Sequence, residues 1–114
     1  MKTIKLLSLT LLAFLCLEAG AQDMRYFEMR TYTAPEGKRP DLVKRFQDHT
    51  LRLFAKAGIE NIGYFIPTDP NDNRLVFILA YPHQAMRHML WAKFATDAEW
   101  LEVSAASEAN GPLV

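Results

Sequence analysis

The chain has 114 residues, and its 13 Lys and Arg balance 13 Asp and Glu, so that the formal net charge is zero. This length suits a single domain. The even charge argues against a protein that binds nucleic acid, because no basic surplus is present to neutralise phosphates. The single cysteine can form neither an internal disulfide nor a cysteine-rich zinc site. Half of the residues are hydrophobic, which is typical of a chain that folds.

Residues 1–21 have the layout of a secretory signal peptide. Two lysines precede an apolar run at residues 6–17, and Ala19 and Ala21 supply the small side chains that signal peptidase recognises. The run is too short to cross a bilayer, which takes about 20 apolar residues. We predict cleavage after Ala21. A lipoprotein signal with acylation at Cys16 ranks behind it, because the residues before that cysteine are bulky.

Cleavage at this point changes the composition of the chain. It leaves the 93 residues 22–114 without cysteine, and it removes two lysines and one glutamate, so that 11 basic and 12 acidic residues give a net charge of −1. An export signal without any use of disulfides suits a bacterial periplasmic or secreted protein. The sequence therefore predicts that location, with no membrane span after cleavage.

The first expected element of the mature chain is a strand at residues 25–33, where side chains alternate with period two. We expect Phe27 and Met29 to face the core. The opposite face is more polar and holds Tyr26, Glu28, Arg30 and Tyr32. This polar face either lines a cavity that orients a small ligand or pairs its charges within the sheet or across a subunit interface, and both interpretations stay open.

After a turn at residues 34–38, apolar residues at helical spacing predict an amphipathic helix over residues 40–57. Proline suits its first turn, and Gly58 is expected to end it in a left-handed conformation. His49 lies at the edge of the apolar stripe. It is either a boundary histidine with one nitrogen in water, which we favour, or a haem ligand or general base in a pocket between helix and sheet.

Two strands follow, at residues 59–67 and 75–81, with a polar turn at residues 68–73 between them. Gly63 predicts a bulge or a close backbone approach in the first of them. The second is continuously apolar, which indicates burial on both faces. The sheet therefore needs a cover on its second side, from further helices or from another sheet.

Two helices complete the order β-α-β-β-α-α. The first is expected over residues 82–95 and carries Trp91 near the edge of a wide apolar stripe, where packing explains it better than stacking on a cofactor. Thr96 and Glu99 have the spacing of a capping box, which predicts Thr96 as the N-cap of a last helix from residue 97. Motifs for phosphate loops, nucleophile elbows, metal sites and redox pairs are absent. We predict no metal site and no cofactor.

Six short segments, in order, carry a resemblance to a known family. They are residues 27–33 (FEMRTYT), 35–38 (PEGK), 63–65 (GYF), 91–94 (WAKF), 97–100 (DAEW) and 107–112 (SEANGP). Through them, residues 24–114 resemble the NIPSNAP family. The resemblance implies a ferredoxin-like β-α-β-β-α-β unit that pairs with a second copy through its sheet, as a dimeric α+β barrel. The family pattern continues into a last strand that is missing before Val114, so we expect a truncated sequence whose first strand is an open edge.

The leading functional hypothesis is an exported homodimeric module that binds a small apolar ligand or a protein partner, since the resemblance carries no established catalytic residues. The alternative is an enzyme, because barrels of this architecture include cofactor-independent and haem-degrading monooxygenases. Haem is expected only under that alternative. A third hypothesis, peptide binding along the open edge, requires the truncation to be real in the cell. The candidate pocket residues are Arg30, Tyr32, His49 and Trp91.

Overall fold

Three antiparallel strands and a set of helices make up the described part of the chain, residues 24–114, in the computed structural model. The predicted signal peptide lies outside the described residues. The elements are β1 (Tyr26–Thr33), α2 (Arg39–Arg45), a π-helical segment (Phe46–Thr50), α3 (Leu51–Ala57), β2 (Glu60–Phe65), β3 (Arg74–Tyr81), a 3₁₀ turn (Gln84–Met86), α4 (Arg87–Ala95) and α5 (Ala98–Ser107). The predicted α+β class and order of elements are confirmed.

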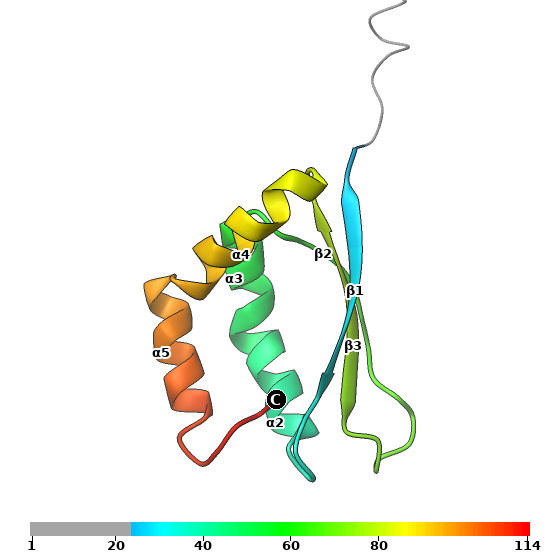
Figure 1. The fold of residues 1–114 in the computed structure, drawn as a ribbon. Helices are drawn as coiled ribbons and strands as arrows, with labels where there is room; N and C mark the ends of the chain where they lie inside the picture. Colours follow the sequence, from blue (N-terminus) through cyan, green and yellow to red (C-terminus); the bar gives the residue numbers. More distant parts are fainter. Residues whose placement is uncertain (1–23) are drawn as a thin grey trace, which may run out of the picture.

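The central strand of the sheet is β3, which lies between β1 and β2 and runs antiparallel to both (Figure 1). After β1 the chain passes through the first helical region to β2, and it then returns as β3 in the position between β1 and β2. The sheet order is therefore β1-β3-β2. A ferredoxin-like unit has the same arrangement of its first three strands. The register shifts between Asn61 and Gly63, which confirms the bulge predicted at Gly63. Within residues 24–114, β1 and β2 are the edge strands.

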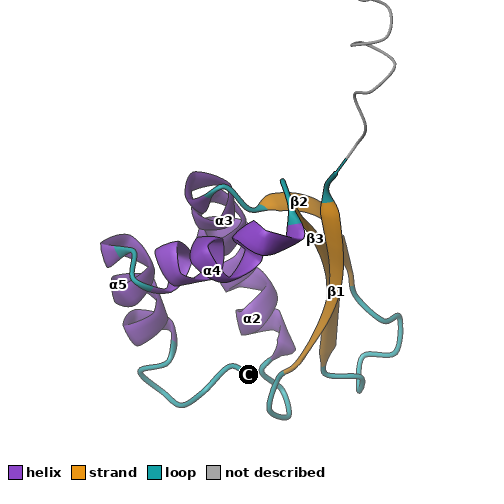
Figure 2. Ribbon diagram, turned by 45° about the horizontal axis from the view of Figure 1, so that its top comes forward, coloured by secondary structure: helices purple, strands orange, loops and turns teal. Residues whose placement is uncertain are grey.

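All the helices lie on one side of the sheet (Figure 2). The core fills the space between them and the inner face of β3, which contributes Leu75, Phe77 and Leu79 with at most 2% of each residue exposed. Aromatic rings of the helical layer pack against those of the sheet. The ring centroid of Phe46, for example, lies 5.2 Å from that of Phe77 on β3. Burial of each such side chain stabilises the fold by about 1.5–3 kcal/mol.

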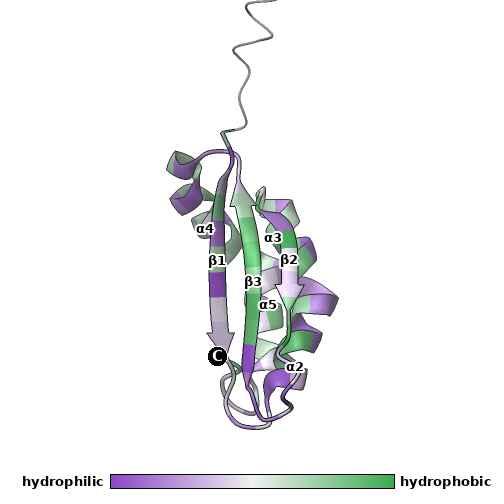
Figure 3. Cartoon of the chain, turned by 90° about the vertical axis from the view of Figure 1, so that its right-hand side faces the viewer, coloured by the Kyte–Doolittle hydropathy of each residue, from purple (hydrophilic) through white to green (hydrophobic). Residues whose placement is uncertain are grey.

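None of the described helices covers the outer face of the sheet, where the ribbon of the central strand β3 is coloured mostly hydrophobic (Figure 3). Phe27 and Met29 on β1 are 49% and 72% exposed, and Phe65 on β2 is 55% exposed. Val76 and Ile78 on β3 point to the same face and are partly buried. The prediction that Phe27 and Met29 face the core is therefore wrong. The second cover expected for β3 is absent from residues 24–114 and stays a prediction.

The inner face of β1 is instead the more polar one. Tyr26 and Tyr32 pack their rings against the core, and Arg30 lays its side chain over neighbouring rings. These side chains combine an apolar body with a polar tip, so they can fill a helix–sheet interface as long as the tips find partners. The apolar residues of β1 are left for the opposite face.

The helix predicted over residues 40–57 is interrupted by the π-helical segment Phe46–Thr50. The backbone N–H of Leu51 bonds to the carbonyl of Phe46, five residues back. One turn therefore holds an extra residue, a feature that often marks functional sites. The helix ends as expected, with Gly58 in the left-handed conformation at φ 98°.

The last two helices begin later than expected. A 3₁₀ turn precedes α4, and His83 caps that turn by accepting a hydrogen bond from the N–H of Ala85. The N-cap of α5 is Asp97, whose carboxylate accepts from the N–H groups of Glu99 and Trp100. The capping box with Thr96 as N-cap is thus wrong, because Thr96 still terminates α4 and donates its hydroxyl to the carbonyl of Ala92.

Candidate functional site

Glu28 is the centre of a hydrogen-bond network between β1 and α4. Its carboxylate accepts from Arg87 at 2.7 Å, from the hydroxyl of Tyr81 at 2.8 Å and from Arg30 at 3.2 Å. Tyr81 in turn accepts from the indole N–H of Trp91 at 2.6 Å. The alternation of β1 directs Glu28 inward, and the antiparallel register places Tyr81 at the end of the neighbouring strand.

The protonation states in this network are set by its hydrogen bonds. Burial alone would favour neutral Glu28, but the donors from Arg87, Tyr81 and Arg30 outweigh it and hold the pKa of this carboxyl below its ordinary value. Burial raises the pKa of Tyr81 to about 12, with a further contribution from Glu28. At neutral pH, Glu28 is therefore an anion and Tyr81 a phenol that donates to it.

Three of the four candidate residues from the sequence lie together here, two of them, Arg30 and Trp91, as members of this network. The guanidinium carbon of Arg30 lies 4.6 Å from the ring centre of Trp91 and 5.6 Å from that of Tyr32. The Nε of Arg30 is buried without a hydrogen-bond partner. A guanidinium between two aromatic rings is a favourable arrangement. A role for these residues in ligand binding stays a prediction.

Tyr81 and Arg87 are site residues that sequence reasoning missed. Tyr81 was interpreted only as part of an apolar run, although a tyrosine in such a run has a hydroxyl that must find a partner when buried. That requirement is the signal that could have found it. Arg87 lies 59 positions from Glu28, and no local pattern connects the two.

A small cavity, which we call the aromatic pocket, opens between the inner face of β1 and the helices. Its volume is about 250 Å³. The wall is mostly aromatic, and Arg45 is the only charged residue in it. The lining residues are Tyr32, Arg45, Phe46, Thr50, Phe54, Phe94, Trp100 and Val114.

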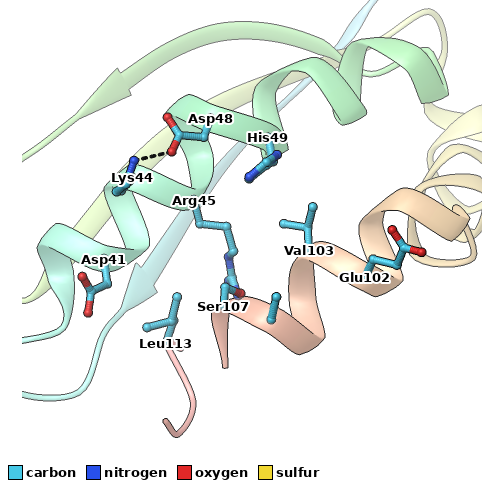
Figure 4. A pocket seen from close by; sticks show the side chains of 10 residues that line it. Asp41, Lys44, Arg45, Asp48, His49, Glu102, Val103, Ser107 and Leu113 are labelled. Atoms are coloured by element: carbon cyan, nitrogen blue, oxygen red, sulfur yellow. Dashed lines mark hydrogen bonds and ion pairs between the residues drawn. The ribbon is translucent and has the colours of Figure 1, made fainter. Parts of the chain in front are cut away.

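A second and wider depression, the helical groove, lies between the first helix and α5 and measures about 520 Å³ (Figure 4). His49 projects from the π-helical segment toward Val103 of α5 there. The structure thus places the fourth candidate residue between two helices, apart from Arg30, Tyr32 and Trp91. The acidic residues Asp41, Asp48 and Glu102 line the groove together with the basic Lys44 and Arg45, and Lys44 pairs with Asp48.

Arg45 lines both the aromatic pocket and the helical groove. Only 6% of its side chain is exposed. One terminal nitrogen donates to the hydroxyl of Ser107 and to the carboxylate of Glu108, each at 3.2 Å, and the guanidinium carbon lies 5.3 Å from the ring centre of Trp100. Its Nε is buried and has no hydrogen-bond partner. An unsatisfied buried donor costs about 1–3 kcal/mol.

Other kinds of site have little support in the described residues. Among residues 24–114, no three His, Cys, Asp or Glu side chains are grouped so that they could hold a metal ion. In the same part of the chain, no helix combines the length and the apolar character needed to span a bilayer.

The single antiparallel sheet with its one-sided helices defines an α+β domain of ferredoxin-like strand order. The sequence model of one family, NIPSNAP, matches residues 27–114. The chain belongs to the NIPSNAP family. The family suggested by its short sequence segments is thereby confirmed. No curated protein matches the chain.

Solved structures of NIPSNAP proteins have the same fold. A NIPSNAP family protein of unknown function from Agrobacterium tumefaciens is 24% identical, with a TM-score of 0.64 over 76% of this chain and 78% of that one. A NIPSNAP-like domain protein from Burkholderia xenovorans is 19% identical, with a TM-score of 0.66 over 82% and 79%. A NIPSNAP domain protein from the same organism is 27% identical, with a TM-score of 0.61 over 74% and 80%. Both Burkholderia proteins are described as uncharacterized.

Proposed function

We propose that this chain is an exported NIPSNAP domain that forms a homodimer and binds a small apolar ligand in the aromatic pocket. The pocket is the observation that carries the proposal. Five aromatic side chains line it, and its volume of about 250 Å³ exceeds the roughly 150 Å³ of an apolar cavity that takes up benzene. A ligand of one ring with a short substituent fits that space.

The outer face of the sheet, which we call the open sheet face because none of the described helices covers it, supports the homodimer. Phe27, Met29 and Phe65 lie exposed on it, beside the apolar residues of β3. Monomeric proteins rarely leave a contiguous apolar face of this kind in water. A second copy of the same face would cover it, and both sides of the apolar β3 strand would then be buried.

The dimer is tested by the sedimentation velocity of the full chain and of two methionine variants. Met29→Glu places a charge on the open sheet face, and Met89→Glu places the same charge on α4, where Met89 is 57% exposed. We expect a dimer for the parent chain and for Met89→Glu, and a monomer for Met29→Glu. A monomeric parent chain, or a dimer that withstands Met29→Glu, would contradict the proposal.

The ligand site is tested by titration calorimetry with toluene. Thr50 is buried against the pocket, so that Thr50→Met fills part of the space, whereas Thr68→Met makes the same change in an exposed turn. We expect toluene to bind the parent chain and Thr68→Met, and to bind Thr50→Met at least tenfold more weakly. Absence of toluene binding to the parent chain would refute the proposed ligand site.

A further inference from the structure

We infer that the ligand of the aromatic pocket is a small monocarboxylate, a single apolar ring or short branched chain that carries one carboxylate, and that Arg45 is the residue that recognises the carboxylate. This inference rests on the proposed function, since it names the chemical class of the ligand in the same pocket. It starts from the charge of the pocket wall, in which one cation stands among neutral side chains.

The position of Arg45 is unusual for an arginine. Its side chain is 94% buried, because only 6% is exposed, and arginine is rarely buried unless its charge is paired. The guanidinium carbon lies 5.3 Å from the ring centre of Trp100, which also lines the aromatic pocket. The charged end of Arg45 is therefore held beside the pocket wall, on a side chain that the surrounding contacts keep in place.

The hydrogen bonds of Arg45 are incomplete. One terminal nitrogen donates to Ser107 and Glu108, whereas Nε is buried and has no partner. Guanidinium offers five N–H groups in a planar fork that matches the two oxygens of a carboxylate. A ligand carboxylate beside the guanidinium would offset the cost of this unsatisfied donor.

None of the acidic side chains described near Arg45 lines the aromatic pocket, so none of them would repel an anion from within it. Glu108 is the one acidic residue bonded to its guanidinium, at 3.2 Å, and its side chain is 37% exposed, so that water weakens the pairing. Asp41, Asp48 and Glu102 belong to the helical groove and do not line the aromatic pocket. A carboxylate that enters the groove would meet these acidic groups beside Lys44 and Arg45, whereas no acidic side chain of residues 24–114 lines the pocket.

The size of the pocket limits the rest of the ligand. The rings of Tyr32, Phe54 and Trp100 among others leave about 250 Å³, which is room for one ring and a carboxylate and too little for a long chain or a fused-ring cofactor. The edges and faces of the aromatic side chains favour an aromatic or a compact aliphatic body.

Benzoate and its neutral isostere benzamide test the inference by titration calorimetry on the full chain, with toluene as the measure of an intact pocket. We expect benzoate to bind at least tenfold more tightly than benzamide, because a buried charge-assisted hydrogen bond discriminates by about that factor. Arg45→Gln should abolish the preference and still bind toluene. Arg52→Gln, which removes a cation at the surface of α3, should keep the preference in full.

The outcomes separate this inference from the proposed function. Equal binding of benzoate and benzamide, or toluene binding without benzoate binding, would overturn the monocarboxylate assignment and leave the apolar pocket standing. Failure of all three compounds to bind the parent chain would overturn both. If Arg45→Gln does not fold, Arg45→Lys decides the role of the residue. This variant keeps the charge without Nε, so we expect a reduced preference for benzoate, and an unchanged one would contradict recognition through the guanidinium.

Discussion

Replacement of Glu28 by Gln tests whether the network between β1 and α4 holds the two layers together. The substitution keeps the size of the side chain and removes its charge, so that Arg87, Arg30 and Tyr81 lose a carboxylate acceptor at 2.7, 3.2 and 2.8 Å. Each hydrogen bond to a charged group contributes about 1.5–3 kcal/mol when it is buried. The Arg87 side chain is 35% exposed, and solvent screening reduces its share. We expect a loss of about 2–3 kcal/mol in the free energy of unfolding.

This loss is measured by urea unfolding and corresponds to a decrease in Tm of roughly 10 °C or more for a domain of this size. The matched control is Glu60→Gln on β2. Glu60 pairs with Arg25 at 3.2 Å, but both side chains are about half exposed, so the cost should stay below about 1 kcal/mol. An equal cost of the two substitutions would refute the network argument.

The pH dependence of the same variant gives a second check. The folded-state pKa of Glu28 is below its ordinary value of 4.5, so its contribution to stability is complete above that pH and is lost as the pH falls through the lowered pKa. The stability difference between the parent chain and Glu28→Gln should therefore shrink below about pH 4.5. A difference that stays constant into strong acid would show that the charge of Glu28 is not its source.

Two further predictions concern α5 and His49. Asp97→Ala removes the N-cap of α5, so we expect the free energy of unfolding in urea to fall by about 1–2 kcal/mol. For the neighbouring Thr96→Ala we expect a loss of less than about 0.5 kcal/mol, and the opposite order of the two losses would contradict the observed cap. For haemin added to the purified chain, we expect the same visible absorption spectrum with the parent chain and with His49→Ala, because the groove around His49 is lined by three acidic and two basic residues and so has no cationic surplus for an anionic porphyrin. A Soret shift that depends on His49 would overturn this expectation and favour the haem-dependent alternative.

The elements of this fold could be predicted from the sequence because they depend on local patterns. Period-two alternation located β1, and Gly58 marked the end of α3. The direction in which β1 faces could not be predicted in the same way. Both of its faces carry large side chains, and the choice depends on partners such as Arg87 that come from distant parts of the chain. Tyrosine and arginine side chains can lie either in water or against a core. Hydrophobicity alone therefore favoured the face of Phe27 and Met29 as the buried one, which is wrong.

The candidate site was predictable only in part for a related reason. Arg30, Tyr32 and Trp91 lie together because of their positions on β1 and α4, as their face of the sheet suggested. His49 was grouped with them only under the interpretation of a pocket between helix and sheet, whereas it comes from the π-helical segment and lies in the groove toward α5. Arg45 attracted no attention in the sequence, since a single arginine on an amphipathic helix is ordinarily a surface residue.

The arginine that lies over each tryptophan gives this protein two built-in optical reporters. Arg30 is 4.6 Å from the ring centre of Trp91, beside the Glu28 network, and Arg45 is 5.3 Å from that of Trp100, at the aromatic pocket. The chain contains two tryptophans in all. The emission of an indole responds to the charge and water around it, so that Trp91→Phe leaves a fluorescence signal from the pocket alone. Because a different arginine lies over each tryptophan, the fluorescence of one remaining tryptophan reports the charge environment of one site at a time.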